Sequence, residues 1–190
     1  SSGIRDGSPK SDFAFYPLPN HQQKFGGMVT FHQFIPNVVS GRQDSVIFKP
    51  NDEGTKYAVE SAVYLQDDWE IGERWKINYG LRWSHFTQVG PYKKFLRDAD
   101  GNKLDSTVYK SLEPIKTYGG LEPRITLRYA IDEATSIKAS VSRNLQYIHL
   151  VSNSGNTLPT DLWVPSTYIV KPQKSWLYAL GLFKNFDDNK

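Results

Sequence analysis

Apolar and polar residues alternate along two neighbouring stretches of the chain, residues 57–71 and 74–89, with a tight connection at Gly72 and Glu73 between them. Successive side chains of a β-strand point to opposite faces, so this pattern predicts two strands that each have an apolar and a polar face. On the second strand the apolar positions are Trp75, Ile77, Tyr79, Leu81 and Trp83. The two stretches therefore predict a β-hairpin with one face rich in aromatic residues and one polar face.

The same alternation recurs in other stretches that are bounded by turn-forming residues, the first of them weaker than the rest. The strands are expected near residues 11–16, 24–34, 57–71, 74–89, 117–131, 136–148 and 175–186. Several exceed the mean strand of about 5–6 residues in soluble proteins. They match or exceed the roughly 9–11 residues that a tilted strand needs to cross a bilayer. The pattern predicts an all-β chain of about seven antiparallel strands.

The connections between these strands alternate in length. The short ones are 17–23, 72–73 and 132–135, and the long ones are 35–56, 90–116 and 149–174. Outer-membrane β-barrels have short turns at one end and long loops at the other, and in bacteria they close with an even number of at least eight strands. The pattern thus favours an arc of a larger transmembrane barrel, with a soluble β-sandwich as the alternative that shows the same alternation.

Composition agrees with a barrel and narrows the alternatives. Five Trp, eleven Tyr and ten Phe accompany a negative mean hydropathy, which suits strands that face water on one side. No stretch approaches the roughly 20 apolar residues of a membrane-spanning helix. The net charge of +3 is small, and no basic stripe with interleaved aromatics indicates nucleic acid. The absence of Cys excludes disulfides, thiolate metal sites and Cys nucleophiles within the chain.

The residues give little support to catalysis. The four His have no metal-ligand spacing, and there is no Gly-x-Ser-x-Gly nucleophile elbow. The adjacent acids Asp67 and Asp68 would point to opposite faces of one strand, so they could not act together on one bond. We therefore expect neither an enzyme nor a bound cofactor or metal.

Several motifs resemble the barrel of TonB-dependent outer-membrane receptors. In that family a strand ending in Gln-Asp-Asp-Trp, here residues 66–69, precedes a tight turn and a strand containing Gly-Leu-Arg-aromatic, here residues 80–83. Residues 121–124 resemble the Glu-Pro-Arg opening of a later strand, and residues 139–148 resemble the strand after it. Residues 158–165 and 170–173 resemble the next loop in receptors of Bacteroidetes type. The resemblance extends from about residue 24 to residue 190.

This resemblance implies a multi-pass segment of a 22-stranded barrel in the bacterial outer membrane. Such receptors import a scarce ligand, and a siderophore, cobalamin, a glycan and a peptide all stay open. The implied partners are the lipid bilayer and its lipopolysaccharide, the receptor's own plug domain, TonB and a possible surface lipoprotein. No plug or TonB box is recognisable in residues 1–190, so we expect a partial barrel. A soluble or surface β-sandwich that binds carbohydrate or protein, or a receptor-like structural subunit of an outer-membrane complex, remains an alternative.

Three groups of residues are candidates for function. The candidates that would face the lumen and contact a plug are Arg82, Glu122, Arg124 and Arg128. The candidates for ligand contact from the last long loop are His149, Asp161, Trp163 and Tyr168. The candidates for the aromatic girdle at the membrane interfaces are Trp69, Trp75, Trp83 and Tyr147. Simple ion pairing on the polar face and simple loop packing are the alternative explanations for the first two groups.

Overall fold

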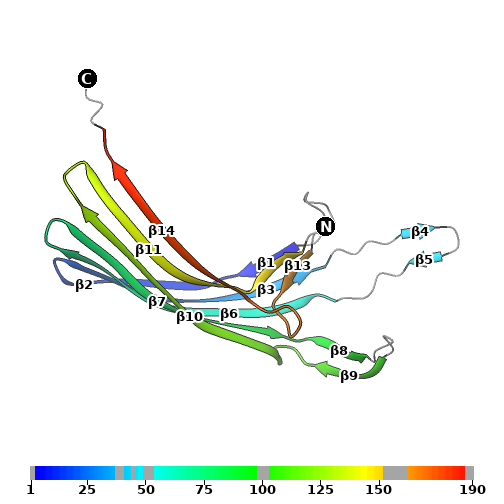
Figure 1. The fold of residues 1–190 in the computed structure, drawn as a ribbon. Coiled ribbons are helices and arrows are strands. Elements are labelled where there is room, and N and C mark those ends of the chain that lie inside the picture. Colours follow the sequence, from blue (N-terminus) through cyan, green and yellow to red (C-terminus); the bar gives the residue numbers. More distant parts are fainter. Residues whose placement is uncertain are drawn as a thin grey trace.

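The computed structural model describes residues 3–36, 41–43, 46–48, 54–97, 103–151 and 162–186. The chain is all-β, and its main sheet is curled into a half-barrel (Figure 1). Within these residues no helix is long and apolar enough to cross a membrane. The expected fold class is confirmed.

The main sheet is antiparallel, and its strands lie side by side in the order of the sequence. The strands are β1 (Gly3–Gly7), β2 (Lys10–Leu18), β3 (His21–Ile35), β6 (Lys56–Ile71), β7 (Trp75–Val89), β10 (Pro114–Ala130), β11 (Thr135–Gln146) and β14 (Gln173–Lys184). Both β1 and β2 pair with β3, one after the other along its length, so the eight strands occupy seven positions. Each of the seven expected strands is present.

The first position of the sheet holds one long strand that a proline interrupts. Gly7 lies opposite Phe31, and Lys10 lies opposite Met28, so β1 and β2 keep one register along β3. Between them Pro9 has no N–H to donate, but its carbonyl still accepts the N–H of Val29 at 3.1 Å. A proline is tolerated in an edge strand because one side of that strand makes no ladder bonds. The sequence pattern revealed only the second half of this strand.

Each long connection contains a short hairpin that the pattern of residues did not predict. The hairpins are β4 (Gly41–Gln43) with β5 (Val46–Phe48), β8 (Tyr92–Arg97) with β9 (Lys103–Tyr109), and β12 (Ile148–Val151) with β13 (Leu162–Pro165). The first two extend away from the end of the sheet opposite the short turns (Figure 1). The long and short connections therefore lie at opposite ends, as expected for a barrel wall.

The register of the strands separates an apolar face from a polar one. Residues directly opposite each other share a face. On the apolar face one such row runs through Phe25, Leu65, Leu81 and Pro123, and the next runs through Gly27, Val63, Trp83 and Leu121. These large apolar side chains are exposed, for example Leu65 at 57% and Leu121 at 48%. The predicted alternation is thus confirmed, with the apolar face left uncovered by the described residues.

The polar face is the concave one. The hairpin β12–β13 follows β11 near one edge of the sheet, yet β13 contacts β1 and β3 at the other edge. A short hairpin can reach across a curled sheet only on its inner side. Its contacts there bury a small cluster made of Phe34, Ala58, Phe86 and Tyr147. The packed core of the described chain therefore lies on the concave face, at the end with the long connections.

In one short turn, between β10 and β11, a carboxylate adds to the backbone hydrogen bonds that close the turn. Oδ1 of Asp132 accepts the backbone N–H of Ala134 at 2.8 Å and that of Thr135 at 2.7 Å. The N–H of Ala134, with further hydrogen bonds from Thr135, holds the pKa of the Asp132 carboxyl below its ordinary value of 3.8. Asp favours such turns because its side chain can bond the backbone two residues on.

We predict that Asp132→Ala destabilises this turn more than Asp132→Asn, because the amide oxygen of Asn can still accept both N–H groups, although without the negative charge. A lowered folded-state pKa means that the charge stabilises the fold above about pH 3.8 and ceases to do so as the pH falls through the folded-state value. Urea midpoints at pH 7 should follow the order wild type, Asp132→Asn, Asp132→Ala. The advantage of wild type over Asp132→Asn should shrink as the pH is lowered below about 3.8, and an advantage that does not change with falling pH would contradict the assignment.

Candidate functional site: a covered row of ionic side chains on the concave face

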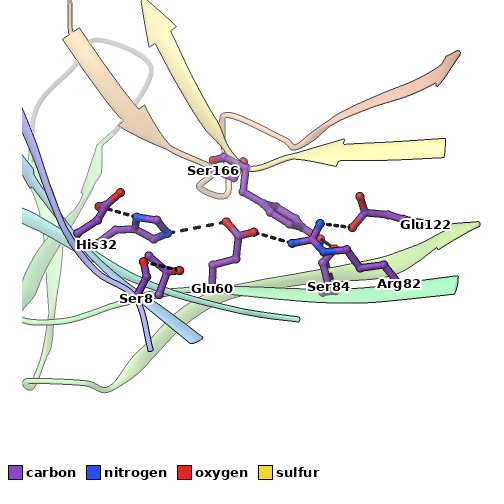
Figure 2. Close-up of polar contacts among 10 residues, drawn as sticks. Ser8, His32, Glu60, Arg82, Ser84, Glu122 and Ser166 are labelled. Carbon is purple, nitrogen blue, oxygen red and sulfur yellow. Dashed lines mark hydrogen bonds and ion pairs between the residues drawn. The ribbon is translucent and has the colours of Figure 1, made fainter. Parts of the chain in front are cut away.

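Five charged or titratable side chains form a row across five strands of the concave face, and we call them the ion row. They are Asp6 of β1, His32 of β3, Glu60 of β6, Arg82 of β7 and Glu122 of β10. Figure 2 shows His32, Glu60, Arg82 and Glu122 following one another in this order. Neighbouring strands place them in one line because paired positions share a face.

The row begins at a histidine between two carboxylates. Nδ1 of His32 lies 2.8 Å from Oδ1 of Asp6, its direct partner in the β1–β3 register. Nε2 of His32 lies 3.8 Å from Oε2 of Glu60, beyond hydrogen-bond distance. The imidazole is 5% exposed, whereas Asp6 is 46% exposed, so the row runs from water at the sheet edge into the covered interior.

Arg82 connects the other two carboxylates of the row. Its Nη1 donates to Oε1 of Glu122 at 2.8 Å, and its Nη2 donates to Oε1 of Glu60 at 3.4 Å. The side chain of Glu122 is only 4% exposed, and that of Arg82 is 21% exposed. Charge-assisted bonds of this kind are strong, but removal of either partner leaves the other charge buried and unpaired. The pair therefore holds β7 in register with β10, and little of it is available for contact with another molecule.

The segment from the last two residues of β11 onward covers the ion row, and we call residues 145–151 and 162–170 the cover. The backbone N–H of Leu145 donates to Oε2 of Glu122 at 3.3 Å. The ring of Tyr147 stacks on Phe86 with centroids 5.1 Å apart, and its hydroxyl oxygen lies 2.8 Å from that of Ser84. The cover thus contacts both the ion row and the apolar cluster, so its base is attached to the concave wall.

A second attachment lies further along the cover. The carbonyl of Tyr147 accepts both the N–H of Ser166 at 2.7 Å and its hydroxyl at 2.9 Å, and Ser166 is fully buried. The hydroxyl of Tyr118 on β10 donates to the carbonyl of Thr167 at 2.6 Å. Figure 2 shows Ser166 above Glu60 and Arg82. The cover is therefore joined to the wall at both ends of the β12–β13 hairpin.

The expectation that Tyr147 belongs to an outer aromatic girdle is wrong. Tyr147 is 3% exposed and packs on the concave face. The alternation of β11 would have put it on the apolar face, but the strand ends at Gln146, and the chain then turns inward. Trp69, Trp75 and Trp83 do occupy apolar-face positions. The ring of Trp75 packs against that of Tyr129, with centroids 4.6 Å apart. Their contact with lipid stays a prediction.

The four expected lumen-facing residues divide into two pairs. Arg82 and Glu122 bond to each other beneath the cover, a contact that the sequence alone did not predict. Arg124 and Arg128 share the concave face but lie nearer the short turns, where both are exposed. Only the second pair is therefore accessible to another molecule in the interior.

The expected ligand-binding residues of the last loop do not converge. Nε2 of His149 lies 3.1 Å from Oγ of Ser166, and burial lowers the pKa of this imidazole. His149 is paired with Val164, whereas Trp163 is paired with Leu150, so His149 and Trp163 lie on opposite faces of the hairpin. Trp163 and Tyr168 are 38% and 45% exposed. Asp161 lies outside the described residues.

Sequence reasoning missed Asp6 and His32 as members of one site. Asp6 lies in the half-strand that the alternation did not reveal, and its direct opposition to His32 depends on the register across Pro9. The part of the chain that the structure describes contains no group of three or more His, Cys, Asp or Glu that could hold a metal ion. The row is a chain of ion pairs and close polar contacts.

A curled antiparallel sheet with a polar, ion-paired concave face and an exposed apolar convex face is the wall of a membrane β-barrel. The family model described as the TonB dependent receptor-like β-barrel matches residues 5–190, and the chain belongs to this family. Members are transporters of the bacterial outer membrane rather than enzymes. Comparison with curated proteins and with solved structures found no match.

We predict that Arg82→Met lowers the free energy of unfolding by about 3–5 kcal/mol, because it leaves the buried Glu122 unpaired. The double variant Arg82→Met with Glu122→Gln should cost less than the sum of the single changes, with a coupling above about 0.5 kcal/mol. Denaturant unfolding of the full-length receptor in lipid vesicles measures all three. Lys110→Met, an exposed control in a long connection, should change stability by no more than about 0.5 kcal/mol. Additive single changes would contradict a direct Arg82–Glu122 interaction.

Proposed function

We propose that this chain forms part of the wall of a TonB-dependent receptor that binds a scarce ligand outside the cell and passes it through the barrel. The observation that carries this proposal is the two-faced curled sheet, which puts exposed apolar side chains on the convex side and ionic side chains on the concave side. The first surface suits hydrocarbon, and the second suits a water-filled or protein-filled interior. Binding and passage, rather than bond making, are the chemistry that such a wall supports.

The main alternative from the sequence, a soluble β-sandwich, would pack the apolar face against a second sheet. In the described parts of the chain this face is exposed, and the buried cluster lies on the opposite, polar face. The arrangement therefore supports the barrel.

The ligand is a siderophore, cobalamin, a glycan or a peptide. Trp163 and Tyr168 are the residues of the cover that support ligand contact, since both rings are partly exposed at the long-connection end. His149 is a weaker candidate because Ser166 engages its ring. The sequence of residues 158–165 and 170–173 supports a receptor of Bacteroidetes type, for which a surface lipoprotein would be a further partner.

Within the barrel we propose that Arg124 and Arg128 contact the plug, because both guanidinium groups are exposed on the concave face. An Arg side chain can hold a carboxylate by two parallel hydrogen bonds. Arg82 and Glu122 would support this surface indirectly, by fixing β7 against β10.

Placement in the membrane can be tested with two neighbouring substitutions. Leu65 is on the convex face, and Gln66 is on the concave face of the same strand. Leu65→Arg should lower the free energy of unfolding in lipid vesicles by about 2–4 kcal/mol, because a cation near the bilayer centre has to leave water. Gln66→Arg should lower the free energy of unfolding by much less. Equal costs for the two substitutions would contradict contact between the convex face and lipid.

Transport can be tested in cells whose only copy of the receptor is the full-length gene. Four radiolabelled probes should be offered: a ferric siderophore, cyanocobalamin, a maltooligosaccharide and a mixed oligopeptide pool. We expect accumulation of one probe that depends on both the receptor and TonB. A receptor that cross-links to no TonB, and whose deletion changes the uptake of none of the four probes, would instead favour a structural subunit.

A further inference from the structure

The strand β14 is apolar on both faces. Its convex positions carry Trp176, Tyr178, Leu180 and Leu182, and its concave positions carry Leu177, Ala179, Gly181 and Phe183. Leu177 and Phe183 are 59% and 49% exposed, so the described residues leave this inner surface uncovered. A strand that is apolar on both sides is typical of one that is buried on both sides. Lipid can cover the convex side, but the concave side needs another partner.

The neighbouring strands place three cations beside this inner apolar surface. Arg128 of β10 lies directly opposite Lys138 of β11, and Nζ of Lys138 is 4.4 Å from the ring centroid of Phe183. Arg124 lies in line with Ser142, which is opposite Leu177. Like charges directly opposite each other on adjacent strands are destabilising unless an anion separates them.

The acids on this part of the concave face are already engaged. Glu70 pairs with Lys76 at 2.7 Å. Asp68 accepts a hydrogen bond from Asn78 at 2.6 Å and lies 3.6 Å from Lys24. Among the described residues no ion pair joins a carboxylate to Arg124, Arg128 or Lys138. The ion row, with three carboxylates against one guanidinium and one imidazole, lies further toward the long connections.

We propose that Arg124, Arg128, Lys138, Leu177, Ala179 and Phe183 form a docking strip for an acidic, partly apolar segment of the receptor's own plug. The inference rests on the proposed function, since it requires a closed barrel with a polypeptide inside. A small anion would neutralise the cations but would leave Leu177 and Phe183 in water, whereas an acidic polypeptide satisfies both. The negative ion row would repel the same segment, so the position of the strip also sets the height of the partner in the barrel.

The proposal can be tested by thiol labelling, because the chain contains no Cys. Single variants Ala179→Cys, Leu180→Cys and Ser111→Cys should be made in full-length receptor whose other segments have had any Cys replaced, and purified into lipid nanodiscs. A water-soluble maleimide should label Ser111→Cys fast, since Ser111 is exposed in a long connection. Ala179→Cys should react at least about tenfold more slowly, because the partner must first open locally.

Charge reversal of the strip provides the decisive comparison. Arg128→Glu with Lys138→Glu should raise the labelling rate of Ala179→Cys toward that of Ser111→Cys, whereas Lys110→Glu, an exposed cation outside the strip, should leave it unchanged. Leu180→Cys faces lipid and should stay slow throughout, which shows that the wall is still folded in the membrane. If the reversed variant fails to insert, Phe183→Ser with Arg128→Gln should give the same acceleration.

Two results would overturn the docking strip: fast labelling of Ala179→Cys in the otherwise unchanged receptor, or slow labelling that neither pair of substitutions relieves. Uptake is measured separately in the same strains. Protection of Ala179→Cys in a receptor that imports nothing would defeat the transport proposal and leave the strip intact. Import through a receptor whose Ala179→Cys is labelled fast would defeat the docking strip and leave the transport proposal intact.

Discussion

Backbone hydrogen bonding between neighbouring strands is the constraint on which this structure depends. A polypeptide in hydrocarbon has no water to satisfy its N–H and C=O groups, so each strand has to bond to the next over its full length. The pairing of β6 with β7 runs without a break from Tyr57 opposite Val89 to Ile71 opposite Trp75. Once this register is set, it determines which side chains lie opposite each other, and it places Arg82 directly opposite Glu122.

A wall of this kind has little hydrophobic core of its own, because its apolar face is turned outward. A small apolar cluster compensates for this missing core on the concave side, where the cover returns to the sheet. Its members are Phe34, Ala58, Phe86 and Tyr147. It also excludes water from the Arg82–Glu122 pair, which strengthens that pair and raises the desolvation cost of losing one partner. Apolar packing and ion pairing are thus coupled at one place, and the cover depends on both.

Alternation in the sequence was sufficient for the long strands of the main sheet and insufficient for β1 and for the hairpins in the long connections. Alternation with a period of two is a local signal, so Leu65 and Leu81 could be assigned to one face before their pairing was known. The opposition of Asp6 to His32 is not local: it depends on a register that continues through Pro9. Tyr147 was misplaced for a related reason, because alternation holds only while the strand lasts, and β11 ends one residue earlier. The hairpin β12–β13 gave no periodic signal because its strands have four residues each.

The same register separates charge along the concave wall. Carboxylates predominate in the ion row near the long connections, and Arg124, Arg128 and Lys138 predominate toward the short turns. Burial acts on the two groups unequally: the cover shields Glu122, whereas the three cations are exposed. Exposed charges interact over about 8 Å at physiological ionic strength, so a molecule in the interior would experience mainly the cations nearest to it. The wall therefore presents a positive surface toward the short turns even though its buried row is rich in acids.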